Sequence, residues 1–338
     1  MLQQTTVAAA IPYFERFLKR FPTVESIAAA REEAVLKLWE GLGYYSRARN
    51  IHKTAKLVVE RSGGGFPEDT GSLASLPGIG RYTAGAIASF AFDRRAPIVE
   101  ANTRRLYCRL LGYEGDPRSG PGQRLLWEFA EQILPTRRPG QFNQALMELG
   151  SAVCTPVGPN CPRCPLRSCC RAFAEGKQSE IPVAAPRPAV THVVEASVAV
   201  RKNGAYLLRR RGPGERWRGL WDFQRFALGT GDVNEPPRTN GSPRPAEVPR
   251  ALKRRLERIV ADASGVRAAV GPLVAEFRHS VTRYRIRLLC FLADYESGKA
   301  APGAEIAWVT PARFADYPLS ATGRKFAELL CAAESGRR

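Results

Sequence analysis

The stretch LASLPGIGRYTAGAI, residues 73–87, places two glycines between two segments with the apolar spacing of helices. Gly78 and Gly80 allow a tight turn with exposed backbone N–H groups, because glycine adopts conformations that other residues avoid. The helix that follows directs its positive N-terminal end the same way. Such a turn can bind a phosphate without reading the bases. The same pattern fits an ordinary helical hairpin, so the rest of the chain has to decide between the two readings.

A second signal is the cysteine-rich segment CTPVGPNCPRCPLRSCC. Four thiolates on one short loop can hold either a zinc ion or an iron–sulfur cluster. Only one pair has the C-x2-C spacing, and we therefore favour a [4Fe–4S] cluster over zinc. Cys169 is a fifth thiol beside Cys170, and which of the two binds depends on whether five residues follow Cys164 before the last ligand. The spacing C-x6-C-x2-C-x5-C selects these ligands: Cys154, Cys161, Cys164 and Cys170.

The composition indicates a polyanionic partner. The 338 residues include 51 Lys and Arg against 32 Asp and Glu, a formal net charge of +19, which attracts nucleic acid over long range. No uncharged apolar stretch approaches the ~20 residues of a membrane helix, and the first residues lack the basic region of a signal peptide. We therefore expect a monomeric cytoplasmic protein of bacterial type that associates with the nucleoid. Three further cysteines lie in apolar contexts typical of buried thiols: Cys108, Cys290 and Cys331.

The length suits two domains, since domains usually have 100–200 residues. Residues 1–173 are mostly helical in pattern; within them Val35, Leu38, Trp39 and Leu42 form one apolar stripe. Residues 174–190 include three spaced prolines and read as a linker.

Residues 191–335 have an α+β pattern. A hairpin turns at Asn203–Gly204, a helix follows near residues 250–266, and strands return over residues 274–295. The Gly- and Pro-rich segment 227–249 reads as a long loop.

A single acid, Glu100, stands about twenty residues after the glycine turn, between an apolar pair and a basic helix. The turn, this acid and the cysteine spacing together resemble the helix–hairpin–helix DNA glycosylase superfamily. MLQQTTVAAAIPYFERF, LWEGLGYYSRARNIHK and FNQALMELGSAVCTP resemble the MutY-type adenine DNA glycosylases, which excise adenine mispaired with 8-oxoguanine. WRGLWDFQRF resembles the Nudix-related domain with which these enzymes sense 8-oxoguanine.

The resemblance implies a helical glycosylase domain over residues 1–173, with a [4Fe–4S] loop at 154–170, and a Nudix-like recognition domain over 191–335. It implies double-stranded DNA with an A:8-oxoguanine or A:G mismatch as the partner. The run of glutamates that holds metal in a true Nudix hydrolase is missing from this sequence, so we do not predict pyrophosphatase activity.

The resemblance also assigns catalytic roles. Glu100 stands at the family's catalytic aspartate, and Asn102 at the asparagine that supports it. Tyr82 stands where lyase relatives have a Schiff-base lysine, which implies base removal without strand cleavage. A carboxylate suits this reaction because positive charge develops on the sugar as the N-glycosidic bond breaks. A second acid usually protonates the leaving base, which must first be flipped out of the duplex.

Other positions are implied to contact DNA. Tyr44 matches an aromatic wedge beside the damaged base, Gln4 a residue inserted in the duplex, and Gln144 a position of the adenine pocket. Each has a structural alternative: Tyr44 in the core, Gln144 on a helix surface, and Asn102 as a helix N-cap. The full set of DNA-binding candidates is Leu2, Gln4, Tyr44, Gly78, Gly80, Gln144, Thr282 and Arg283.

The chain departs from the family in three places. Glutamate replaces aspartate at position 100, which moves the carboxylate by roughly 1.5 Å, a misplacement that can cost on the order of a hundredfold in rate. The family's general-acid glutamate lies just before MLQQT, so we expect translation to start upstream; the alternative is a natural truncation. Val281, Thr282 and Arg283 replace the family's Phe-Ser-His turn, in which Thr282 keeps a hydroxyl and Arg283 could bind a phosphate.

Three hypotheses follow. The first is a monofunctional adenine glycosylase that acts on mispaired DNA. The second keeps the fold but removes thymine or uracil opposite guanine; Gln144 favours adenine, because its amide both donates and accepts hydrogen bonds. The third is a mismatch- or lesion-binding protein without catalysis, suggested by the glutamate at position 100.

Overall fold

The computed structural model describes the chain except for residues 185–188, 229–247, 301–304 and 336–338. Most of the predicted loop at 227–249, and part of the predicted linker at 174–190, therefore lie outside the described residues. The chain forms two compact units, Met1–His52 with Pro188–Arg338, and Lys53–Arg187. The domain boundaries expected from sequence stay predictions.

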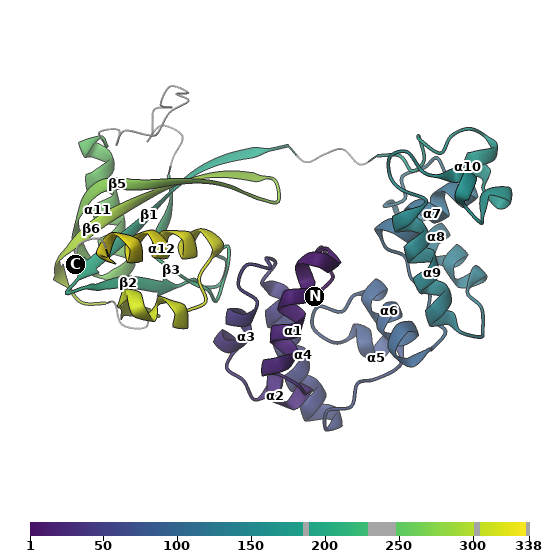
Figure 1. Cartoon of the computed structure of the whole chain (residues 1–338), viewed down its shortest axis with the longest axis horizontal. Helices are drawn as coiled ribbons and strands as arrows, with labels where there is room; N and C mark the ends of the chain where they lie inside the picture. The colour runs from purple at the N-terminus through teal and green to yellow at the C-terminus, as the bar shows by residue number, and fades with distance from the viewer. Residues whose placement is uncertain (185–188, 229–247, 301–304, 336–338) are drawn as a thin grey trace. The chain divides into compact units, whose positions relative to one another are not determined.

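The first half of the chain is helical throughout its described residues (Figure 1), which confirms the predicted fold class for this part. The apolar stripe from Val35 to Leu42 does not lie on one helix, because a helix ends at Leu38 and the chain then turns at Gly41 and Gly43, which have positive φ values of 96° and 74°. The elements are α1 (Val7–Arg20), α2 (Val24–Ala28), α3 (Glu32–Leu38), α4 (Ser46–Ser62), α5 (Thr70–Ala74), α6 (Arg81–Phe92), α7 (Ala101–Leu111), α8 (Gly120–Ile133), α9 (Pro139–Ala152), the 3₁₀ turns η1 (Cys161–Arg163) and η2 (Arg167–Cys169), and α10 (Arg171–Ala174).

In the Lys53–Arg187 unit, helix α7 lies in the core. Its Leu106, Tyr107 and Cys108 are buried and belong to a cluster shared with α8 and α9. Two glycines permit close helix contacts: a Cβ at Gly85 would lie 2.3 Å from the Pro97 carbonyl oxygen, and one at Gly150 would lie 2.8 Å from the Cβ of Asn102. Helices α6 and α9 are therefore held tightly against the segment that carries Glu100.

The second half forms a mixed sheet with helices on both faces (Figure 1), which confirms the predicted α+β class. The strand order is β3-β2-β1-β6-β5, with β4 paired to β1 and β7 paired to β2. β1 runs parallel to β6 and antiparallel to β2 and β4. The elements are β1 (Thr191–Lys202), β2 (Ala205–Arg210), β3 (Trp221–Asp222), β4 (Gln224–Leu228), α11 (Arg250–Ser264), β5 (Val266–Val281), β6 (Tyr284–Gly298), β7 (Ile306–Val309), η3 (Pro311–Asp316) and α12 (Ala321–Ser335).

Alternation along β1 assigns the two faces of the sheet. Val198 and Val200 pack in the cluster that contains α11, whereas Ala199 packs in the cluster that contains α12. The predicted hairpin is confirmed: Lys202 pairs with Ala205 across Asn203 and Gly204, which both have positive φ. Two of the three scattered cysteines, Cys108 and Cys290, are fully buried, and Cys331 is partly buried. No helix among the described residues has the length and apolarity needed to cross a bilayer.

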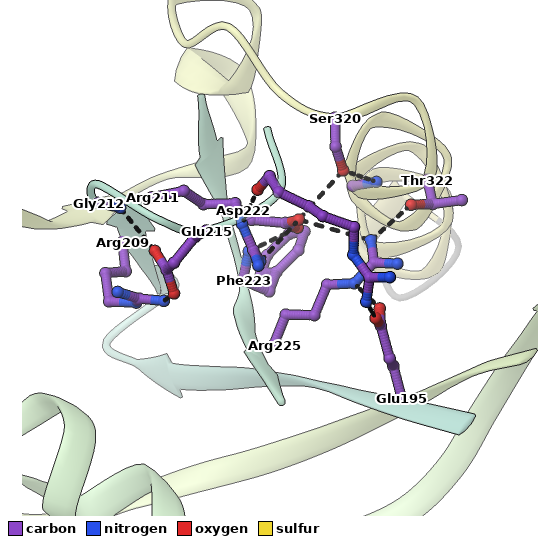
Figure 2. Close-up of polar contacts among 12 residues, drawn as sticks. Glu195, Arg209, Arg211, Gly212, Glu215, Asp222, Phe223, Arg225, Ser320 and Thr322 are labelled. Atoms are coloured by element: carbon purple, nitrogen blue, oxygen red, sulfur yellow. Dashed lines mark hydrogen bonds and ion pairs between the residues drawn. The ribbon is translucent and has the colours of Figure 1, made fainter. Parts of the chain in front are cut away.

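A buried charge network joins β1, β3, β4 and α12 (Figure 2). Arg225, with a side chain only 1% exposed, donates to Glu195 Oε2 at 2.6 Å and to Thr322 Oγ1 at 2.9 Å. Asp222 accepts from Ser320 Oγ at 3.1 Å, and its Oδ2 lies 3.7 Å from Arg225 Nη1. Removing either member of such a pair leaves an uncompensated buried charge, which is strongly destabilising. The network therefore has a structural role, and it engages the buried carboxylates of Glu195 and Asp222.

Helices from the start of the chain belong to the same compact unit as this sheet. Leu220 lies in one buried cluster with Phe17 and Trp39. Arg324 Nε donates to Glu40 Oε1 at 2.6 Å. The C-terminal residues and the first helices therefore share both a core and ion pairs.

Candidate functional site

The glycine turn joins α5 to α6 as the sequence predicts. Gly78 has φ +79°, a conformation that glycine adopts at no steric cost. Gly80 is the N-cap of α6, no side chain caps this helix end, and a Cβ at Gly80 would meet nothing within 4 Å. Thr54 Oγ1 donates to the Pro77 carbonyl at 3.1 Å and anchors the turn. The first N–H groups of α6 have no side-chain cap, and uncapped N–H groups at a helix start are able to bind an anion.

Glu100 begins helix α7. Its Oε1 accepts from the backbone N–H of Asn102 at 2.7 Å and of Thr103 at 2.8 Å, while Thr103 Oγ1 accepts from the Glu100 N–H at 2.9 Å. This reciprocal pair is a capping box. The N-cap is thus Glu100 itself and not Asn102, the alternative considered from sequence. One oxygen does all the capping, and Oε2 has no hydrogen-bond partner among the described residues.

Tyr82 lies close to this acid. Burial raises the pKa of the Tyr82 hydroxyl, and the charge of Glu100 raises it further. The hydroxyl contacts the sulfur of Met147 on α9 at 3.8 Å. Gln144 is exposed and lies three residues before Met147 on the same helix. Because residues three apart lie on the same face of a helix, Gln144 and Met147 share that face. Helices α6, α7 and α9 therefore contribute to one group of side chains around Glu100.

Asn102 connects this group to the cysteine loop through an arginine that sequence reasoning missed. Arg105 Nη2 donates to Asn102 Oδ1 at 3.0 Å and to the Gly150 carbonyl at 2.6 Å, and its Nε donates to the Cys154 carbonyl at 2.7 Å. One turn later, Arg109 Nη1 donates to Cys154 Sγ at 3.2 Å. Both arginines are buried. Their spacing of four residues on an otherwise buried helix was the available signal.

We expect Arg105→Gln to lower the free energy of unfolding of this unit by about 3 kcal/mol, because two buried carbonyls lose a charged donor. Thermal or denaturant unfolding measures the change. Arg104→Gln is the matched control, since the side chain of Arg104 has no hydrogen bond to the cysteine loop among the described residues. Equal stability of the two variants would contradict the assigned connection.

The four predicted ligands, Cys154, Cys161, Cys164 and Cys170, line one pocket beside Arg109. Burial raises the pKa of Cys164 and of Cys170, and the neighbouring thiols raise it further. Cys169 does not line this pocket; it is exposed and its thiol donates to the Leu166 carbonyl. Within the described ranges, no group of three or more His, Cys, Asp or Glu side chains is gathered closely enough to hold a metal ion as it stands. The donor set is nevertheless all thiol, with a guanidinium beside it to offset negative charge, and this chemistry fits a cluster.

Three of the DNA-binding candidates lie near the start of the other unit. Leu2, Gln4 and Tyr44 are exposed, which excludes the core alternative for Tyr44, and both Gln4 and Tyr44 have positive φ. A second residue that sequence reasoning missed holds them together. Arg47 donates to the carbonyls of Met1 at 2.6 Å, of Gln3, and of Gly43 at 3.2 Å.

The last two candidates occupy the turn between β5 and β6. Thr282 and Arg283 are exposed, and Thr282 has φ +51°. The Thr282 hydroxyl donates to the Val281 carbonyl at 2.7 Å, and Arg283 Nη2 donates to the hydroxyl of Tyr284 at 3.3 Å. The turn consists of Thr282 and Arg283 alone, because Val281 is the last residue of β5, and the roles of these side chains stay predictions.

Comparisons with known proteins agree with this organisation. Residues 1–132 match the family described as "HhH-GPD superfamily base excision DNA repair protein", and residues 196–329 match "NUDIX domain". The adenine DNA glycosylase of Rattus norvegicus is 47% identical over 186 residues, which cover 54% of this chain and 36% of that protein. The adenine DNA glycosylase of Buchnera aphidicola from Acyrthosiphon pisum is 36% identical over 226 residues, 67% of this chain and 65% of that protein.

Among solved structures, a thermostable thymine-DNA glycosylase is 27% identical with a TM-score of 0.47, covering 52% of this chain and 80% of that one. The chain thus spans less than two thirds of the length of the curated relatives named above. The chain therefore contains a domain of the helix–hairpin–helix (HhH-GPD) superfamily of base excision DNA repair proteins at residues 1–132, followed by a NUDIX domain at residues 196–329.

Proposed function

We propose that the protein is a monofunctional adenine DNA glycosylase, which removes adenine mispaired with 8-oxoguanine or guanine. The observation that carries the proposal is the carboxylate of Glu100. Its Oε1 is held at the start of α7 by two backbone N–H groups, whereas its Oε2 has no partner among the described residues. Adenine DNA glycosylases of two organisms, similar to this chain at 36–47% identity, support the choice of base.

In the proposed reaction the C1′–N9 bond breaks and its electron pair leaves with the base. The positive charge that develops on the sugar is stabilised by the negative charge of Glu100. Water then supplies the hydroxyl group to C1′ and the hydrogen to the released base. Tyr82 has no amine with which to form a Schiff base, and burial keeps its hydroxyl neutral, so the sugar–phosphate backbone stays intact.

The remaining residues bind and orient the duplex. The turn at Gly78 and Gly80, with the N-terminus of α6, binds a backbone phosphate, and Gln144 hydrogen-bonds the flipped adenine. Cys154, Cys161, Cys164 and Cys170 would hold a [4Fe–4S] cluster, which when bound would tie the cysteine loop to α7 through Arg109. Arg105 transmits the position of that loop to Asn102 and hence to the start of α7.

The test is single-turnover release of labelled base by protein purified from its native host. Duplexes with A:8-oxoguanine, A:G, T:G and U:G pairs are compared. We expect adenine release from the first two, with a strand that breaks only after hot alkali. Release of thymine or uracil alone would identify a glycosylase for another mispaired base. Tight binding to mismatches without any abasic product would identify a binding protein instead.

Arg47 offers a prediction about the DNA-contacting segments. We expect Arg47→Lys to weaken binding to an A:8-oxoguanine duplex about tenfold, because an ammonium cannot span the carbonyls of Met1 and Gly43 as the planar guanidinium does. Fluorescence anisotropy measures the affinity. Arg61→Lys, at an exposed position later on α4, is the control and should bind as the parent does.

A further inference from the structure

Helix α11 has an arginine-rich outer face that the proposed reaction does not use. Its inner face is apolar: Leu252, Leu256 and Val260 are buried against the sheet. Three arginines at intervals of four residues lie on the opposite side and are exposed: Arg250, Arg254 and Arg258. Because four residues make slightly more than one turn, these side chains form one stripe along the helix.

Ion pairs with the described residues of the unit do not account for this stripe. Among the described residues, none of the three arginines has a carboxylate partner within an ion-pair distance. The acid closest to them in sequence, Glu257, faces the sheet instead, where its Oε1 accepts from the Val270 N–H at 3.0 Å. Arg250 also begins the helix, where a cation is unfavourable next to the positive end of the helix dipole. Neither packing nor helix stability therefore explains the arginines.

The spacing of the stripe fits a nucleic-acid backbone. Successive arginines are separated by ~6 Å along the helix axis, and one DNA strand has a phosphate about every 3.4 Å of its axis. Each flexible guanidinium can therefore reach a phosphate of its own. Contacts of this kind bind any sequence and are lost steeply as salt increases.

We propose that Arg250, Arg254 and Arg258 form a second duplex-binding surface, which binds the DNA backbone through the sheet domain irrespective of sequence. The inference deepens the proposed function and rests on it for the identity of the polyanion. A glycosylase that scans undamaged duplex needs contacts that ignore sequence, and this surface supplies them on a face of the sheet different from the one that packs α12.

The experiment compares three full-length proteins on an undamaged duplex between 50 and 200 mM salt. The first is the parent, and the second is Arg250→Gln/Arg254→Gln/Arg258→Gln, which keeps residues of good helix propensity. The third is Arg118→Gln/Arg201→Gln/Arg313→Gln, which removes the same charge from arginines that pair with Asp116, Asp294 and Asp316. Thermal unfolding checks that all three are folded.

We expect the α11 variant to lower the slope of log K against log salt by about 2.7, at ~0.9 for each lost phosphate contact. Over this salt range the parent's affinity would then fall roughly 40-fold more than the variant's. The control variant should change the slope by less than about 1. Equal slopes for the two triple variants would overturn the inference, because only net charge would matter. The assay does not depend on base release, so failure of adenine excision in the parent is a separate result.

Discussion

We expect the replacement of Glu100 by glutamine to lower the single-turnover rate of the proposed adenine release by roughly a thousandfold. The amide is neutral, so the charge that stabilises the developing positive sugar is lost, and preorganised charges of this kind contribute on the order of 10²–10³ in rate each. The amide oxygen can still accept the N–H groups of Asn102 and Thr103, as Glu100 Oε1 does. The helix cap is therefore largely retained, and the loss reports chemistry more than folding.

Two companion variants make this result decisive. Glu128→Gln removes an exposed carboxylate from α8 and should leave the rate unchanged. Glu100→Asp retains both the charge and the cap and withdraws the carboxylate by roughly 1.5 Å. Because the family that the chain resembles has aspartate at this position, this variant should release adenine at a rate at least equal to that of the parent. A glutamine variant within tenfold of the parent would show that Glu100 does not act in the reaction.

The features that local sequence determines were predicted from sequence alone. The glycine turn needs only the positive φ of Gly78, and the hairpin needs only that of Asn203 and Gly204. The buried apolar face of α11 follows from the spacing of its own residues, and the four thiols that line one pocket come from one short segment. In each case, residues close together in the chain account for the result.

The features that sequence missed depend on residues far apart in the chain. Arg105 reaches Cys154 across 49 positions, Arg47 reaches Met1 across 46, and Arg324 reaches Glu40 across 284. A long charged side chain normally reads as exposed surface, because burial of an arginine depends on partners that no local pattern reveals. Arg225 is the clearest case, since its guanidinium is enclosed by groups from the four elements β1, β3, β5 and α12.

The cap at Glu100 was predicted only in part, because it depends both on local sequence and on the burial of the preceding residues. The stretch Glu100-Ala101-Asn102-Thr103 contains a capping box in which the acid comes first and the threonine third after it. The sequence alone also offers Asn102 as the capping residue, since asparagine is among the preferred N-caps. The preceding apolar pair, in which Ile98 is fully buried, sets the start of the helix two residues earlier.

We expect the replacement of Cys170 by serine to remove the proposed [4Fe–4S] cluster, and the replacement of Cys169 by serine to leave it intact. Cys170 lines the same pocket as Cys154, Cys161 and Cys164, while the thiol of Cys169 is exposed and hydrogen-bonded to the Leu166 carbonyl. Serine cannot supply the thiolate that an iron–sulfur cluster requires. The parent and Cys169→Ser should each contain about four irons per chain with the visible absorbance of a cluster, and Cys170→Ser should contain almost none.

The same comparison tests what the cluster does for the fold. Because Arg109 contacts Cys154 Sγ and Arg105 contacts its carbonyl, loss of the cluster frees the loop that these two arginines hold against α7. Cys170→Ser should therefore unfold at lower temperature and release adenine more slowly, while Cys169→Ser matches the parent in both. About one zinc per chain in the parent would replace the [4Fe–4S] assignment by a structural zinc site. Equal metal loss in both variants would show that the ligand set includes Cys169, so that the loop closes around the metal in a register different from the C-x5-C spacing.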